Sequence, residues 1–165
     1  DDWKDIPMEK VDNIKNVKVG APDVNLMGST KAYWRDMNDL SYTVQIAWQE
    51  NGLYVLINVI DDKLVFAPDK GAKAHLYDSV EIFFDGRGES GNLDRITTGA
   101  IQFLVIPSLK ETPGSCKVVD LLQHSDYFDI RFVGMKTEKG YMMEGRINPK
   151  QTSKFQTSNF KFPTT

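Results

Sequence analysis

The sequence has one cysteine and no long apolar run, and both shortages limit what the chain can be. Cys116 is the only cysteine among 165 residues, so no disulfide bond can form within the chain. No apolar stretch approaches the roughly 18 residues of a membrane-spanning helix, so we expect no membrane span. The formal net charge is −3 and no basic stripe occurs, which argues against nucleic-acid binding.

Motifs for cofactors and catalysis are also scarce. His75 and His124 are the only histidines, and neither has a second His or Cys at zinc-ligand spacing. No G-x-S-x-G nucleophile elbow occurs, although a Ser-His-Asp arrangement of distant residues stays open. Residues 86–91 fit G-x-G-x-x-G, but a predicted strand follows them where a dinucleotide site needs a helix. The sequence therefore predicts no catalytic residues and no required cofactor.

What is present is an ordinary globular balance, with 41% hydrophobic and 26% charged residues. A chain of this length can bury roughly 70% of its unfolded surface, so its core needs no disulfide or metal. We expect one domain over residues 1–165. The chain starts at Asp1-Asp2 without an apolar h-region, so we expect a signal peptide to be absent or removed.

Hydrophobicity along the chain has a period of two. Residues 40–48 place an apolar side chain on every second position, which indicates a half-buried strand. Asn51-Gly52 is a strong hairpin signal, and residues 53–60 return as an apolar strand that we expect to be central in a sheet. Trp48 is in register with the apolar positions of its strand, so we predict it in the core.

The rest of the chain shows the same pattern. No window of 11 or more residues carries a helical stripe, and turn signals separate the apolar segments. Seven or eight such strands predict an all-β fold, an antiparallel β-sandwich of jelly-roll or immunoglobulin-like type. The further strands are expected at residues 78–85, 99–106, 127–133 and 141–147, with weaker candidates at 14–19 and 117–121.

Three aspartates at strand ends are candidate metal ligands. Asp61 and Asp62 close one predicted strand, and Asp78 opens the next. Ca²⁺ takes six to eight oxygen ligands, so clustered carboxylates could hold it. The alternative is that Asp is common in turns, where it bonds its own backbone. A glycosidase would need two carboxylates across a cleft, which the sequence alone does not show.

Aromatic residues in predicted loops are candidates for stacking on a sugar. Trp34 and Tyr33 lie in a polar segment, and Tyr77 lies beside Asp78. The apolar C–H face of a sugar fits a flat ring, while its hydroxyl groups need a few fixed polar partners. Trp34 could instead cap the edge of the sandwich. The candidate polar partners in neighbouring loops are Arg95, Asn92 and His75.

Several segments, taken together and in order, resemble family 9 carbohydrate-binding modules. Each segment alone is a weak match, but their common order over roughly residues 1–150 is more specific. The matching segments are Asp1–Pro7, Asp39-Leu-Ser41, Ala47-Trp48, Leu53-Tyr54-Val55, Val59–Asp62, Tyr77–Asp85, Gly140-Tyr141, Glu144 and Ile147–Pro149.

The resemblance implies a β-sandwich that binds saccharides by holding a terminal sugar between aromatic rings, often with structural calcium. It further implies a secreted, periplasmic or cell-surface module that accompanies polysaccharide-degrading enzymes and is not catalytic itself. A spacer domain that has lost its sugar site is the alternative, and a small glycoside hydrolase is a third. The family usually has a final strand after the position of Pro149. Here only Phe160 and Phe162 suggest one, so we expect it to be divergent or truncated.

Overall fold

A computed structural model of the chain describes residues 2–12, 36–65, 77–85, 100–108, 110–120 and 128–150. Every regular element within these ranges is a β-strand. No helix there has the length and hydropathy needed to span a bilayer. The strands are β1 (Met8–Val11), β2 (Leu40–Gln49), β3 (Gly52–Asp61), β4 (Val80–Asp85), β5 (Ala100–Ile106), β6 (Gly114–Ser115), β7 (Lys117–Asp120), β8 (Phe128–Thr137) and β9 (Gly140–Pro149).

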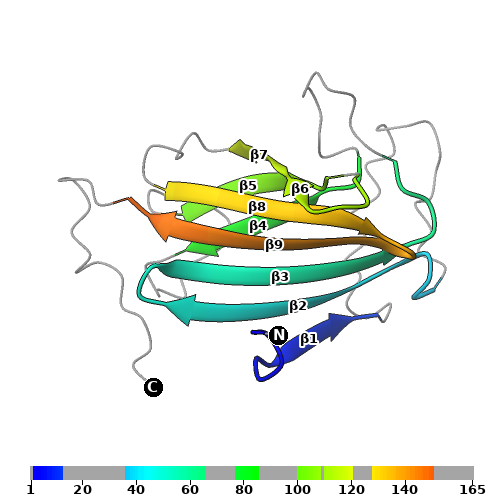
Figure 1. Cartoon of the computed structure of the whole chain (residues 1–165), viewed down its shortest axis with the longest axis horizontal. Coiled ribbons are helices and arrows are strands. Elements are labelled where there is room, and N and C mark those ends of the chain that lie inside the picture. The colour runs from blue at the N-terminus through cyan, green and yellow to red at the C-terminus, as the bar shows by residue number, and fades with distance from the viewer. Residues whose placement is uncertain are drawn as a thin grey trace.

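The strands form two antiparallel sheets. The larger sheet has the order β1-β2-β3-β9-β8-β6, and the smaller has the order β4-β5-β7. Figure 1 shows the smaller sheet behind the upper strands of the larger one. This arrangement confirms the predicted antiparallel β-sandwich.

The two predicted hairpins are present. β2 and β3 pair from Leu40↔Asp61 to Gln49↔Gly52, with the turn at Glu50-Asn51. β8 and β9 pair around the turn at Glu138-Lys139, and both run further than the sequence pattern indicated. The short strands β1 and β6 were not predicted. β6 has only two residues, and the apolar residues of β1, Met8 and Val11, are three positions apart and do not alternate. The candidate strand at residues 14–19 lies outside the described residues.

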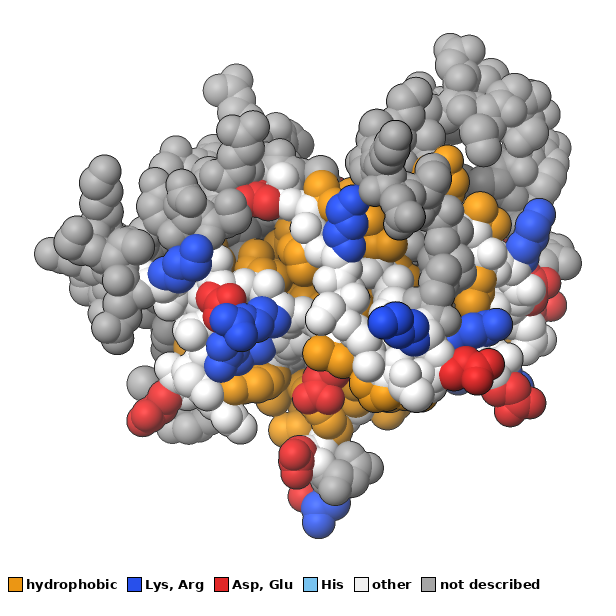
Figure 2. Space-filling model, turned by 45° about the horizontal axis from the view of Figure 1, so that its top comes forward, with side chains coloured by type: hydrophobic (Ala, Val, Ile, Leu, Met, Phe, Trp, Pro, Cys, Tyr) orange, Lys and Arg blue, Asp and Glu red, His pale blue; other side chains and the backbone are white. Residues whose placement is uncertain are grey.

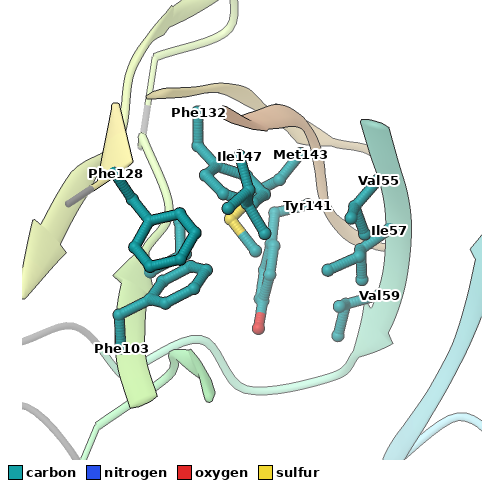
Figure 3. Packing of buried hydrophobic residues seen from close by; sticks show 10 residues of the cluster. Val55, Ile57, Val59, Phe103, Phe128, Phe132, Tyr141, Met143 and Ile147 are labelled. Atoms are coloured by element: carbon teal, nitrogen blue, oxygen red, sulfur yellow. The ribbon is translucent and has the colours of Figure 1, made fainter. Parts of the chain in front are cut away.

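The core lies between the two sheets, and on β3 it follows from the alternation of side chains along the strand. On β3, Val55, Ile57 and Val59 point to one side and are at most 4% exposed. Phe103 on β5 of the smaller sheet and Phe132 on β8 of the larger sheet belong to the same core cluster (Figure 3). The centroids of these two rings are 6.2 Å apart. Burying each such side chain contributes about 1.5–3 kcal/mol, so this cluster is the main source of stability.

The prediction that Trp48 belongs to the core was wrong. The register places Trp48 on the core-facing side of β2, opposite Leu53, but its side chain is 40% exposed. Ile46, on the same side, is 56% exposed, and Val44 is the one β2 residue that packs against the core cluster. The period of two identifies the face correctly. It does not tell how far the opposing sheet extends, and the shared core is built on β3, β9, β8 and β5.

Two glycines on β9 allow close packing. A Cβ at Gly140 would lie 2.2 Å from the carbonyl oxygen of Val59, so glycine is needed where β9 starts beside the end of β3. A Cβ at Gly145 would lie 2.3 Å from ring carbons of Phe132, which occupies the space above this residue. The Phe132 ring therefore packs directly on the β9 backbone.

We expect Gly145→Ala to lower the free energy of unfolding by about 1–3 kcal/mol, because the added methyl group overpacks the core against Phe132. Urea unfolding measures this change. In the double variant Gly145→Ala/Phe132→Leu the smaller side chain leaves room for the methyl group. Its loss should therefore be smaller than the sum of the two single losses, and simple additivity would contradict the proposed contact.

Candidate functional site

Two of the three predicted metal-ligand aspartates, Asp61 and Asp78, lie near one another at the end of β3. Asp61 is the last residue of β3, and its N–H donates to the carbonyl of Lys139 over 2.9 Å. Asp78 lies just before β4, and its N–H donates to the carbonyl of Val65 over 2.8 Å. The N–H of Val65 donates in return to Oδ2 of Asp78. This reciprocal pair of bonds holds Asp78 against the segment that leaves β3.

The environment of Asp78 favours its protonated form. Burial, followed by the charge of Asp61 and a hydrogen bond between the two carboxyl groups, raises the pKa of the Asp78 carboxyl to about 6. The bond from the Val65 N–H acts in the opposite direction. Asp61 is also anchored, because the N–H of Lys63 donates to its Oδ1 over 2.8 Å. When both carboxyl groups are ionised, their negative charges repel each other and destabilise the folded state.

Tyr141 completes this cluster, which we call the acidic corner: Asp61, Asp78 and Tyr141. Tyr141 is 4% exposed, and the register places it opposite Val59, two residues before Asp61. Figure 3 shows its ring in the core and its hydroxyl oxygen pointing away from Phe132 and Met143. Burial, followed by the negative charges of Asp78 and Asp61, raises the pKa of the Tyr141 phenol. The phenol therefore keeps its proton at the edge of the carboxylate pair.

The acidic corner offers oxygen atoms only, which suits a hard cation such as Ca²⁺ rather than zinc. Asp62, the third predicted ligand, is exposed. Within the described part of the chain, no group of three or more His, Cys, Asp or Glu residues could hold a metal ion. A cation at the corner would therefore take its remaining ligands from carbonyl groups or water.

The predicted sugar-binding residues fall mostly outside the described residues. Tyr33, Trp34, His75, Asn92 and Arg95 all lie in those other segments. Tyr77 is described: it is half-buried, and its carbonyl accepts a hydrogen bond from the Ser79 hydroxyl over 3.1 Å. Its neighbour Asp78 makes two hydrogen bonds with the backbone of Val65, so the backbone of Tyr77 is anchored next to the acidic corner.

Sequence reasoning did not identify Tyr141 as part of a site. Tyr141 was noted only as the first residue of a predicted strand and as part of Gly140-Tyr141, one of the short segments that resemble family 9 carbohydrate-binding modules. The signal that would have found it is the register of β3 with β9, because Tyr141 faces the end of the strand that carries Asp61. That pairing joins segments about 80 residues apart and has no local sequence signature.

The fold and this corner define an antiparallel β-sandwich with an oxygen-rich cluster beside one strand end. Residues 20–162 match the sequence model of the family described as "Carbohydrate family 9 binding domain-like". Because the match covers most of the chain, the protein belongs to this family. The match starts after Asp1–Pro7 and continues past Pro149. No curated protein and no solved structure matches the chain.

The pH dependence of stability tests the electrostatics of the acidic corner. The pKa of Asp78 is about 6 in the folded chain and about 3.9 in an unfolded one, so the folded state binds more protons between these values. Stability from this group is therefore fully present below pH ~4 and is lost as the pH rises through ~6.

With a chelator present, we expect Asp78→Asn to match the wild type near pH 4 and to melt a few degrees higher above pH 7. The amide oxygen can still accept the Val65 bond, but it carries no charge. Thermal unfolding at a series of pH values measures the difference. Asp62→Asn, at an exposed neighbour, serves as the control. If Asp78→Asn followed the wild-type pH profile throughout, the corner would not have the electrostatics described here.

Proposed function

We propose that this protein is a non-catalytic carbohydrate-binding module, secreted or at the cell surface, that accompanies the degradation of extracellular polysaccharides. The observation that carries the proposal is the family match over residues 20–162 on a chain that folds as a two-sheet sandwich. Members of such families contribute binding rather than bond cleavage.

For the sugar site we propose stacking on Trp34, Tyr33 and Tyr77. The proposal rests on the chemistry of these residues and their places in the sequence. Tyr77 has the further support of an anchored backbone beside the acidic corner. An aromatic ring removes the apolar sugar face from water, while polar groups orient the hydroxyls. The polar partners proposed from neighbouring segments are Arg95, Asn92 and His75.

Titration calorimetry with a panel of reducing and non-reducing mono- and disaccharides tests this function. We expect saturable binding with a preference for one kind of sugar end, and a loss of about tenfold or more in affinity at that site for Trp34→Ala. Removing a stacked ring should cost at least about 1.4 kcal/mol. Phe83→Ala is the matched control, since Phe83 is an aromatic residue on β4 that is 60% exposed and not proposed to bind.

Absence of binding across the whole panel, in buffer with calcium, would count against a sugar-binding function. The spacer-domain alternative would then be preferred. An equal loss for Trp34→Ala and Phe83→Ala would show that the effect is not specific to the proposed site.

We also propose that the acidic corner binds a structural Ca²⁺ ion. The support is the pair Asp61 and Asp78, whose mutual repulsion a divalent cation would relieve, together with a set of ligands made of oxygen alone. Bound calcium would join the end of β3 to the segment that enters β4. Asp62 is the predicted third ligand and could contribute through water.

Calcium should raise the melting temperature of the wild type, and EDTA should reverse the effect, because a ligand that binds only the folded state stabilises it. We expect a rise of several degrees at saturating calcium. Asp61→Asn and Asp78→Asn should abolish the rise, and Asp62→Asn should reduce it. Magnesium at equal concentration controls for ionic strength. An unchanged calcium response in Asp78→Asn would rule out the corner as the binding site.

A further inference from the structure

The face of the larger sheet that points away from the core carries a row of four cross-strand neighbours. Ala47 on β2 is opposite Tyr54 on β3, Tyr54 is opposite Arg146 on β9, and Arg146 is opposite Arg131 on β8. Directly opposite residues in antiparallel strands point to the same side. Figure 2 shows acidic and basic side chains next to one another on the surface of the molecule. Asp129 lies two residues before Arg131 on β8 and therefore shares this face. We call the polar and aromatic residues of the face, Tyr54, Asp129, Arg131 and Arg146, the outer-face row.

Tyr54 gives this row a ring that is held in place. The side chain is half-buried, and its hydroxyl donates to Oδ1 of Asn51 over 2.9 Å, in the turn between β2 and β3. Its directly opposite neighbour on β2 is Ala47, which has only a methyl group. A ring fixed before binding loses little conformational entropy when a ligand stacks on it.

Asp129 fixes the two arginines. Its Oδ1 accepts from Nε of Arg131 over 3.0 Å, and its Oδ2 accepts from Nη2 of Arg146 over 3.3 Å. Hydrogen bonding to Arg131, and then the charges of Arg131 and Arg146, lower the pKa of Asp129, so it stays ionised. Each guanidinium uses one of its five N–H donors in these bonds. The Arg131 side chain is 74% exposed and that of Arg146 is 32% exposed.

The charges of this surface cancel. Glu144 is exposed and lies two residues from Arg146 on the same face of β9, so two carboxylates accompany two guanidinium groups. An anionic ligand would meet no net attraction here. A neutral ligand with adjacent hydroxyl groups can both donate to Asp129 and accept from the arginines, while its apolar face lies on Tyr54.

We propose that the outer-face row binds a neutral saccharide through residues other than Trp34, Tyr33 and Tyr77. The inference rests on the proposed carbohydrate-binding function and adds a second contact surface to it. Because the row extends across β3, β9 and β8, it can contact several successive sugar units, including units from the middle of a chain. The proposed ligand is therefore the interior of an uncharged oligosaccharide.

Titration calorimetry with neutral oligosaccharides of several linkages, and with uronic-acid oligosaccharides of equal length, tests this site. We expect Arg131→Gln and Tyr54→Leu each to weaken binding at this site by about tenfold, the loss of one hydrogen bond to a charged group or of one stacked ring. Lys10→Gln is the matched control. Lys10 is an exposed cation on β1 that pairs with Asp12 over 2.8 Å, as Arg131 pairs with Asp129.

The Trp34→Ala background separates the two sites. Binding of neutral oligosaccharides that persists in Trp34→Ala and disappears in Trp34→Ala/Arg131→Gln supports the outer-face row. Binding that Trp34→Ala abolishes, and that Arg131→Gln and Tyr54→Leu leave unchanged, overturns this inference but keeps the carbohydrate-binding function. No binding of any saccharide by the wild type overturns both.

Charge gives an independent criterion. Affinity for neutral oligosaccharides should change little between low and high salt, because no net charge is neutralised. Circular dichroism should show that the exposed-site variant Arg131→Gln remains folded. Selective binding of uronic-acid oligosaccharides that weakens steeply with salt would overturn the assignment of a neutral ligand.

Discussion

The pairing of β3 with β9 is the contact on which the rest of this structure depends. One face of the pair supplies core residues such as Val55 and Met143, and the other carries Tyr54 beside Arg146. The same register places Tyr141 at the end of the strand that carries Asp61. A slip by one residue would exchange the two faces of β9, moving Arg146 into the core. Core, acidic corner and outer-face row are thus three consequences of one register.

Glycine makes this register possible. At Gly140 the β9 backbone approaches the Val59 carbonyl so closely that no side chain fits, and at Gly145 the Phe132 ring occupies the place of a side chain. A wrong register would place a bulky residue at these two positions. The close approaches therefore stabilise the correct alignment and also penalise the alternatives.

The sequence predicts the parts of this fold that depend on neighbouring residues, but not the pairing of distant segments. Alternation over residues 40–48 and the Asn51-Gly52 turn identify β2, β3 and their hairpin, because both signals lie within a few residues. The pairing of β3 with β9, and the extent of overlap between the two sheets, depend on segments distant in sequence. That is why Trp48 was assigned to the correct face but to the wrong degree of burial. It is also why Tyr141 was not recognised beside Asp61 and Asp78, although both aspartates were predicted, together with Asp62, as metal ligands.

Asp129 on β8 and Asp78 before β4 show how the surroundings of a carboxyl group decide its pKa and its role. Asp129 lies between two guanidinium groups, so its charge is compensated within the protein and its pKa is lowered. Asp78 is partly buried and faces another carboxylate, so burial first and then the charge of Asp61 raise its pKa. The first arrangement holds side chains in place without any ligand. In the second arrangement, protonation of Asp78 removes the repulsion between the two carboxylates. The acidic corner, unlike the ion pairs of Asp129, therefore couples the stability of the fold to pH.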